Sequence, residues 1–203
     1  MNIRRRGRGG AGRVLLALLL LGGTACMKHG TDGDHRPGGS PFRLEPIGVI
    51  RSPYTPETGA PRQGRFAPEV ESRIVLRPEY AQGLADVETF THLIVIYLFD
   101  RSKGWSPLVR TPWEERRHGV FATRSPDRPN PIGLTVVKLA GREGNVLHVL
   151  GLDAFDGTPV LDIKPYIPRL DRVEGAGGGW VERVRMPAGR SVPSGGKEEP
   201  PPR

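Results

Sequence analysis

The sequence predicts an all-β, β-rich fold, namely a small single-sheet β-barrel with short helical segments and disordered N- and C-terminal extensions. Short apolar or alternating stretches follow one another along the chain, and almost none has apolar residues at helical spacing. The 203 residues include 28 Gly and 21 Pro, which supply turn signals between these stretches. A parallel α/β sheet would alternate strands with amphipathic helices, so a closed or nearly closed barrel is favoured.

The expected strands are short and lie between turn signals. Residues 92–99, HLIVIYLF, form a continuous apolar, β-branched run and predict a strand buried on both faces. Residues 81–90 predict one or two helical turns, and residues 100–118 predict a long loop, a feature that is often functional. The other expected strands lie within residues 42–50, 71–80, 119–123, 132–139 and 146–155. Residues 156–168 predict a turn followed by an extended segment bounded by proline.

The chain divides into four segments by composition. Residues 1–26 resemble a signal peptide with a lipobox-like cysteine, and residues 27–41 predict a flexible linker rich in Gly, Pro and charge. Residues 42–186 hold the expected barrel domain, and residues 187–203 predict a disordered tail. A chain of this length therefore contains one domain with a modest core.

The N-terminal segment indicates an export signal. Basic residues precede the apolar run Val14–Leu21, which is too short to span a bilayer, and small residues precede Cys26. In bacterial lipoproteins the cysteine at this place is acylated, which predicts a membrane-anchored lipoprotein lipidated at Cys26. Two alternatives remain: a cleaved ordinary signal, or a translation start at Met27 that would make the protein cytoplasmic.

The net charge gives little support to a nucleic-acid partner. The formal net charge is +8, but five arginines precede Val14, and removing them leaves +3 on the remainder. A surplus this small does not create a strongly basic protein, so any RNA contact must come from local patches.

The segment ATRSPDRPNPIG, residues 122–133, is a candidate for a binding loop. Three prolines, Pro126, Pro129 and Pro131, restrict the backbone before any ligand binds. Arg124 and Arg128 present planar guanidinium groups suited to carboxylate, phosphate or a stacked base. A proline-rich connector with solvated arginines explains the composition equally well.

Two further segments are candidates of lower specificity. In DGTPVLDIKPY, Asp156 and Gly157 have turn chemistry, and Asp162 and Lys164 lie on one side of an extended chain. A β-turn followed by a surface ion pair is the simpler interpretation. The segment PRQG, residues 61–64, is a turn by default and a donor-bearing loop if it meets the other two segments in space.

No metal site is predicted. The five histidines show no paired ligand spacing, and the single cysteine lies outside the expected domain. The sequence also has no common phosphate-binding loop and no nucleophile elbow. Trp105 and Trp113 lie in the expected long loop and are candidates to stack a base, although tryptophans in such places are as often hydrophobic plugs or part of an interface.

Five ordered segments together resemble the TrmO (TsaA-like) family of S-adenosylmethionine-dependent tRNA methyltransferases. These segments are residues 47–54, 61–64, 91–105, 119–139 and 156–168. The pattern ATRSPxRPNPIG followed by DGTPxLDIKPY is close to diagnostic for the family. The resemblance implies a dimeric β-barrel methyltransferase that binds S-adenosylmethionine and methylates N6 of threonylcarbamoyladenosine next to the tRNA anticodon.

The resemblance also assigns residues to the site. The cofactor is expected to contact Pro61, Arg62, Gln63, Asp100, Arg101, Arg124, Leu134, Asp156, Gly157, Thr158 and Pro159. Asp100 is a departure, because the family usually has histidine there. The candidate substrate contacts are Arg128, Lys103 and Trp105. Asp156 is the candidate acceptor of the adenine N6 proton, with a backbone carbonyl as the alternative.

The resemblance leaves two other functions open. Longer family members carry an additional C-terminal module, whereas this chain continues after Arg185 as a Gly/Pro-rich tail. The export signal favours an alternative, a non-enzymatic lipid-anchored envelope protein that uses the barrel as a ligand-binding module. Methylation of a small molecule or of another RNA is the third possibility.

Overall fold

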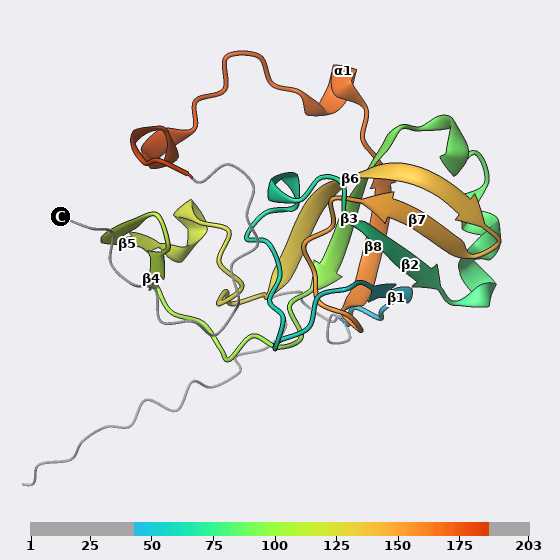
Figure 1. Ribbon diagram of the computed structural model, residues 1–203, viewed down its shortest axis with the longest axis horizontal. Coiled ribbons are helices and arrows are strands. Elements are labelled where there is room, and N and C mark those ends of the chain that lie inside the picture. The colour runs from blue at the N-terminus through green and yellow to red at the C-terminus, as the bar shows by residue number, and fades with distance from the viewer. Residues whose placement is uncertain (1–42, 187–203) are drawn as a thin grey trace, which may run out of the picture. The chain divides into compact units, whose positions relative to one another are not determined.

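The computed structural model describes residues 43–186 (Figure 1). The expected signal peptide, the lipidation site Cys26, the linker over residues 27–41 and the tail over residues 187–203 lie outside the described residues and stay predictions. None of the helices between residues 43 and 186 is long and apolar enough to cross a membrane.

Six antiparallel strands close into a barrel (Figure 1). Around the barrel they are β1 (Gly48–Arg51), β2 (Glu71–Leu76), β7 (Val146–Leu150), β6 (Ile132–Glu143), β3 (His92–Leu98) and β8 (Pro159–Pro165). The barrel closes where β1 pairs with β8, at Gly48 opposite Val160. Closure leaves no strand of the barrel with a free edge, and the predicted fold class is confirmed.

The core fills the barrel because side chains alternate along each strand. In β3, Leu93, Val95 and Tyr97 point inward and are buried, whereas the alternate residues are only half-buried. The prediction that this strand is buried on both faces is therefore wrong: a strand in a closed barrel has an inner and an outer face. The inward residues of the other strands complete one cluster, which includes Ile50, Ile74, Leu147, Val149 and Val160.

Strand β6, with 12 residues, pairs with its two neighbours along successive parts of its length. Residues 132–138 pair with β3, and residues 138–143 pair with β7. The register shifts between Leu139 and Gly141, so the strand bends where it leaves one partner for the other. The turn that follows contains Gly144, whose φ of +59° favours glycine.

The helical segments are short, as predicted. The 3₁₀ helices η2 (Pro78–Leu84) and η3 (Val87–Thr89) cover the expected one or two turns. The other 3₁₀ helices are η1 (Gly64–Phe66), η4 (Val120–Ala122) and η5 (Gly179–Arg183), and one α-helical turn, α1, spans Pro168–Asp171.

Two local predictions are corrected between β3 and β6. The expected long loop contains a hairpin of β4 (Leu108–Thr111) and β5 (Glu114–Gly119), which forms a separate two-stranded sheet. The expected strand at residues 119–123 is instead the end of β5 and the 3₁₀ helix η4. Neither segment has a clear alternation of apolar and polar residues, so tertiary packing decides their structure.

Candidate functional site

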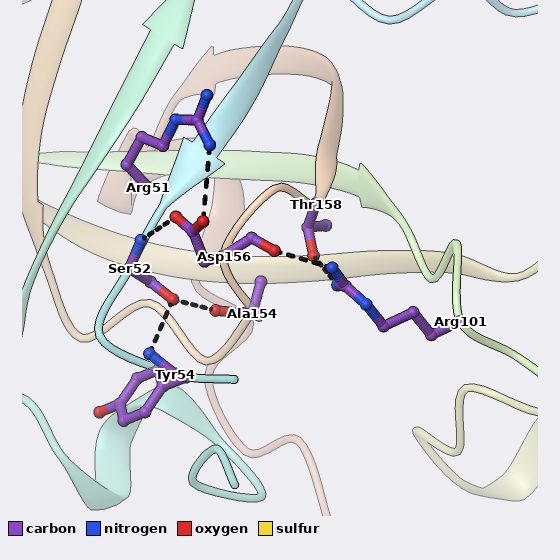
Figure 2. A network of polar contacts seen from close by, with 7 residues as sticks. All are labelled: Arg51, Ser52, Tyr54, Arg101, Ala154, Asp156 and Thr158. Atoms are coloured by element: carbon purple, nitrogen blue, oxygen red, sulfur yellow. Dashed lines mark hydrogen bonds and ion pairs between the residues drawn. The ribbon is translucent and has the colours of Figure 1, made fainter. Parts of the chain in front are cut away.

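The turn that begins at Asp156 is held by polar contacts on both sides of its backbone (Figure 2). The Asp156 carboxylate accepts a hydrogen bond from the Ser52 backbone N–H at 3.2 Å and lies 3.5 Å from Nη1 of Arg51. Gly157 has a φ of +80°, a conformation that side chains with a Cβ rarely adopt. The sequence DG at this point therefore specifies the turn that the structure contains.

Arg101 holds the other side of the same turn (Figure 2). Its Nη2 donates to the Asp156 carbonyl at 2.9 Å, and its Nη1 donates to the Thr158 hydroxyl at 3.5 Å. The guanidinium also lies 3.6 Å from the Asp100 carboxylate. The structure thus brings Asp100 and Arg101, at the end of β3, together with the Asp156 turn, as a shared site requires.

Arg124 and the PRQG loop meet in the same way. Arg124 Nη1 donates to the Gln63 side-chain oxygen at 2.8 Å, and the Gln63 amide donates to the Arg62 carbonyl at 2.6 Å. Pro61, two residues before Gln63, is buried. Residues that are 61 positions apart in the chain are therefore in contact, with Gln63 as the acceptor. PRQG thus meets the loop that carries Arg124, and its role as a donor-bearing loop stays a prediction.

A polar cluster inside the barrel fixes the PRQG loop in place, and sequence reasoning did not find it. Both Tyr97, at 3.1 Å, and Thr135, at 2.5 Å, donate from their hydroxyls to Oδ1 of Asp153. The Gly64 backbone N–H donates to Oδ2 at 3.0 Å. Asp153 thereby connects β3, β6 and the loop that carries Gln63. The available signal was an acidic residue among the apolar residues that follow β7.

Burial shifts the titration of this cluster. Desolvation raises the pKa of Asp153 above its usual value, although the hydrogen bonds from Thr135, Tyr97 and Gly64 act in the opposite direction. Desolvation also raises the pKa of Tyr97, and the neighbouring Asp153 carboxylate adds to that effect. The cluster therefore holds its protons more tightly than the same groups would in water.

Both groups of contacts lie at one end of the barrel. Asp100 and Arg101 follow β3, Asp156 precedes β8, and Asp153 lies three residues before Asp156. Gly133, at the start of β6, packs on the Tyr97 ring so closely that a Cβ there would lie 2.3 Å from a ring carbon. This end of the barrel, which we call the barrel mouth, carries most of the predicted cofactor residues.

Leu134 is placed differently from the others, because it points outward from β6 and is 52% exposed. Among the candidate substrate contacts, Lys103 and Trp105 are exposed. Arg128 uses Nη1 to donate to the carbonyls of Val120, Thr123 and Ser125, and so braces its own loop. The roles of all these residues in binding stay predictions.

A cavity of about 310 Å³ adjoins the Asp156 turn. It is lined by residues 51–53, residues 71–73 and Asp156, and shares only Asp156 with the predicted cofactor residues. The other predicted cofactor residues lie outside the lining of this cavity, in the contacts around Arg101 and Arg124 or elsewhere. Between residues 43 and 186 no group of three His, Cys, Asp or Glu side chains is arranged to hold a metal ion.

Comparison with known proteins shows which family and which relatives this chain is similar to. Residues 49–172 match the family model described as the tRNA-methyltransferase O N-terminal domain. A probable S-adenosyl-L-methionine-binding protein of Archaeoglobus fulgidus is 56% identical over 142 residues, which cover 70% of this chain and 38% of that protein. The tRNA (adenine(37)-N6)-methyltransferase of Escherichia coli is 39% identical over 153 residues, covering 70% of this chain and 65% of that enzyme.

The fold agrees with this likeness. The crystal structure of TrmO from Pseudomonas aeruginosa aligns with a TM-score of 0.58 at 37% identity, covering 70% of this chain and 63% of that one. This chain thus spans less than two thirds of several of its relatives. Since the family model covers more than half of the chain, the chain belongs to the tRNA-methyltransferase O family and contains its N-terminal domain.

Proposed function

We propose that this protein binds S-adenosylmethionine at the barrel mouth and transfers its methyl group to N6 of an adenine in tRNA. At finer detail, the proposed substrate is threonylcarbamoyladenosine next to the anticodon. The observation that carries the proposal is the meeting of Arg124 with Gln63, and of Arg101 with the Asp156 turn, at one end of a barrel of this family. The names of the relatives support the cofactor and the tRNA substrate.

The groups at the mouth fit the cofactor chemically. S-adenosylmethionine carries a carboxylate, an ammonium group and an adenine, and the mouth offers arginines, the Asp156 carboxylate and backbone groups of tight turns. When bound, the cofactor supplies an activated methyl group on a sulfonium, so the protein must align the reactants and exclude water. The rigid contacts of Arg101 and Arg124 hold two loops in place for this task before any ligand binds.

The proton of the adenine N6 needs an acceptor, and Asp156 is the proposed one. Its carboxylate is 42% exposed at the side chain and is oriented by the Ser52 N–H and by Arg51. An acceptor must reach the proton in the bound complex, so a carboxylate fixed at a rigid turn is suited to this role.

Arg124→Ala is expected to weaken S-adenosylmethionine binding about tenfold, because charge-assisted hydrogen bonds and the support of Gln63 are lost together. Isothermal titration calorimetry of the purified full chain measures this. Arg169→Ala is the matched control, because Arg169 lies in α1, beyond the end of β8 far from the Asp156 turn. A wild-type chain that binds no S-adenosylmethionine would refute the proposed function.

We also propose that two copies of the chain form a homodimer through the outer face of β6. Ile132, Leu134 and Val136 point outward there and are 39%, 52% and 43% exposed. A closed barrel has no free edge for strand pairing, so association through the barrel itself would use an outer face, and this outer face is apolar. Since Leu134 is also an expected cofactor contact, the dimer would place the second copy close to the cofactor.

Val136→Glu is expected to dissociate the dimer, because it places a charge in the apolar face on each side of the two-fold axis. Sedimentation velocity at several protein concentrations measures the mass. Leu170→Glu, at an exposed residue of α1, is the control that should leave the mass unchanged. A wild-type chain that stays monomeric at high concentration would contradict the proposal.

A further inference from the structure

One face of the β4–β5 hairpin, together with η4, combines arginines with exposed apolar side chains. Arg110 and Arg117 are register partners across the hairpin, so their side chains lie on the same side. Leu108 shares that side because it lies two residues before Arg110 on the same strand. Phe121, two residues beyond the end of β5, is 77% exposed. We call Leu108, Arg110, Arg117 and Phe121 the hairpin face.

The two positive charges of the hairpin face, on Arg110 and Arg117, lie directly across the strand pair from each other. Like charges directly across an antiparallel pair destabilise it. Neither Arg110 nor Arg117 has an ion-pair partner among residues 43–186, and both side chains are exposed. Of the two acids in β5, Glu114 is bound to the His118 ring at 2.6 Å, and Glu115 is exposed two residues before Arg117 and forms no ion pair among residues 43–186. A bound polyanion would remove the repulsion between the two arginines.

The other face of the hairpin is anchored to the rest of the domain. Val109 and His118 are buried, and the His118 ring stacks on Trp180 of η5 with centroids 3.9 Å apart. Trp113, in the hairpin turn, contacts Phe66 edge-on at 6.0 Å. These contacts hold the hairpin in one orientation, so its exposed face is preorganised.

The contacts of Trp113 with Phe66 and of His118 with Trp180 also connect the hairpin to the segments that carry Gln63 and Arg124. Phe66 belongs to η1, which begins directly after Gln63. The Trp180 indole N–H donates to the Ala122 carbonyl at 2.8 Å, two residues before Arg124. The hairpin is thus attached at both ends to the two loops that meet through Gln63 and Arg124.

We propose that the hairpin face binds single-stranded RNA and presents an unpaired loop of the substrate to the barrel mouth. This inference rests on the proposed function and names the part of the RNA that is recognised. Arg110 and Arg117 bind consecutive phosphates, and Phe121 stacks on an unpaired base. Arg128, with its Cζ 6.0 Å from the Phe121 ring centroid, stabilises that ring through a cation–π contact.

The test measures binding of a labelled tRNA anticodon stem-loop to the full chain by fluorescence anisotropy at a series of salt concentrations. Phe121→Ala is expected to weaken binding about tenfold without changing the salt dependence, because stacking releases no counterions. Arg110→Gln and Arg117→Gln are each expected to reduce the slope of log K against log salt by about 0.7.

Matched controls come from the C-terminal part of the domain. Leu170→Ala removes a side chain that is 70% exposed, and Arg169→Gln removes one positive charge from the same helical turn. Neither should change RNA affinity. Thermal unfolding and S-adenosylmethionine titration of each variant verify that the fold and the mouth are intact, so a loss of RNA binding cannot be ascribed to misfolding.

Three results would overturn the inference. In the first, the wild-type chain binds the stem-loop and the three hairpin variants bind it equally well. In the second, Phe121→Ala leaves RNA affinity unchanged but lowers the mass in sedimentation, which would make the face an interface between copies. Because S-adenosylmethionine binding is measured separately, a chain that binds the cofactor but no RNA rejects this inference and leaves the cofactor site standing.

Discussion

Asp153→Ala is expected to lower the free energy of unfolding by about 3 kcal/mol and to loosen the PRQG loop. The substitution leaves the Tyr97 and Thr135 hydroxyls and the Gly64 N–H without their shared acceptor inside the barrel. Each partly buried polar group left unsatisfied costs on the order of 1 kcal/mol or more. Urea unfolding measures the stability, and calorimetry measures the accompanying loss of S-adenosylmethionine affinity.

Asp153→Asn is the conservative control, and it also tests the raised pKa. Since the folded state holds the Asp153 proton more tightly than the unfolded state, this group makes stability fall as pH rises from about 4 through the folded-state pKa. The fall is up to about 1.4 kcal/mol per pH unit within that window. Asparagine does not titrate, so this variant should show a flatter profile; an unchanged profile would contradict the assignment.

Gly64→Ala is the second substitution with a large expected effect. A Cβ at this position would lie 1.8 Å from the Gly151 carbonyl oxygen, which belongs to the backbone and cannot rotate away. The loop must therefore move off the barrel, which we expect to cost about 3 kcal/mol. The movement also breaks the hydrogen bond to Asp153 and displaces Gln63 from Arg124, so cofactor binding should weaken together with stability.

Gly83→Ala is the matched control for this prediction. Gly83 lies in η2, and a Cβ there would meet nothing within 4 Å. Because alanine restricts the unfolded chain more than glycine does, this variant should be neutral or slightly stabilised. Equal losses of stability in both variants would show that close packing at Gly64 is not the cause.

The sequence predicted two parts of the proposed cofactor site, the turn at Asp156 and the loop around Arg124, but not the residues that they contact. The DG turn at Asp156 and the proline-restricted loop around Arg124 are specified locally, because Gly and Pro limit the backbone wherever they occur. Their partners are not local. Arg101 reaches the Asp156 turn across 55 positions, and Asp153 reaches Gly64 across 89 positions. No periodicity or composition in the sequence indicates such a pairing.

The hairpin over residues 108–119 is local structure that the sequence did not predict. Charged residues and proline hide any alternation there, and the segment was expected to be a loop. Its strands persist because Val109, His118 and Trp113 are packed against distant parts of the domain, including Trp180 and Phe66. Packing against neighbours commonly outweighs the intrinsic preference of a strand.

The sequence by itself determined the β-rich class, the barrel strands with clear apolar patterns, the tight turns and the family to which the chain belongs. These features depend on side-chain alternation and on backbone restriction, which act between residues close in the chain. Only the tertiary structure decided that Asp153 anchors the PRQG loop, that Gln63 meets Arg124 and that Arg110 and Arg117 face the same side. Those pairings arise because closing the barrel brings distant strand ends to one mouth, where burial favours polar groups that satisfy one another.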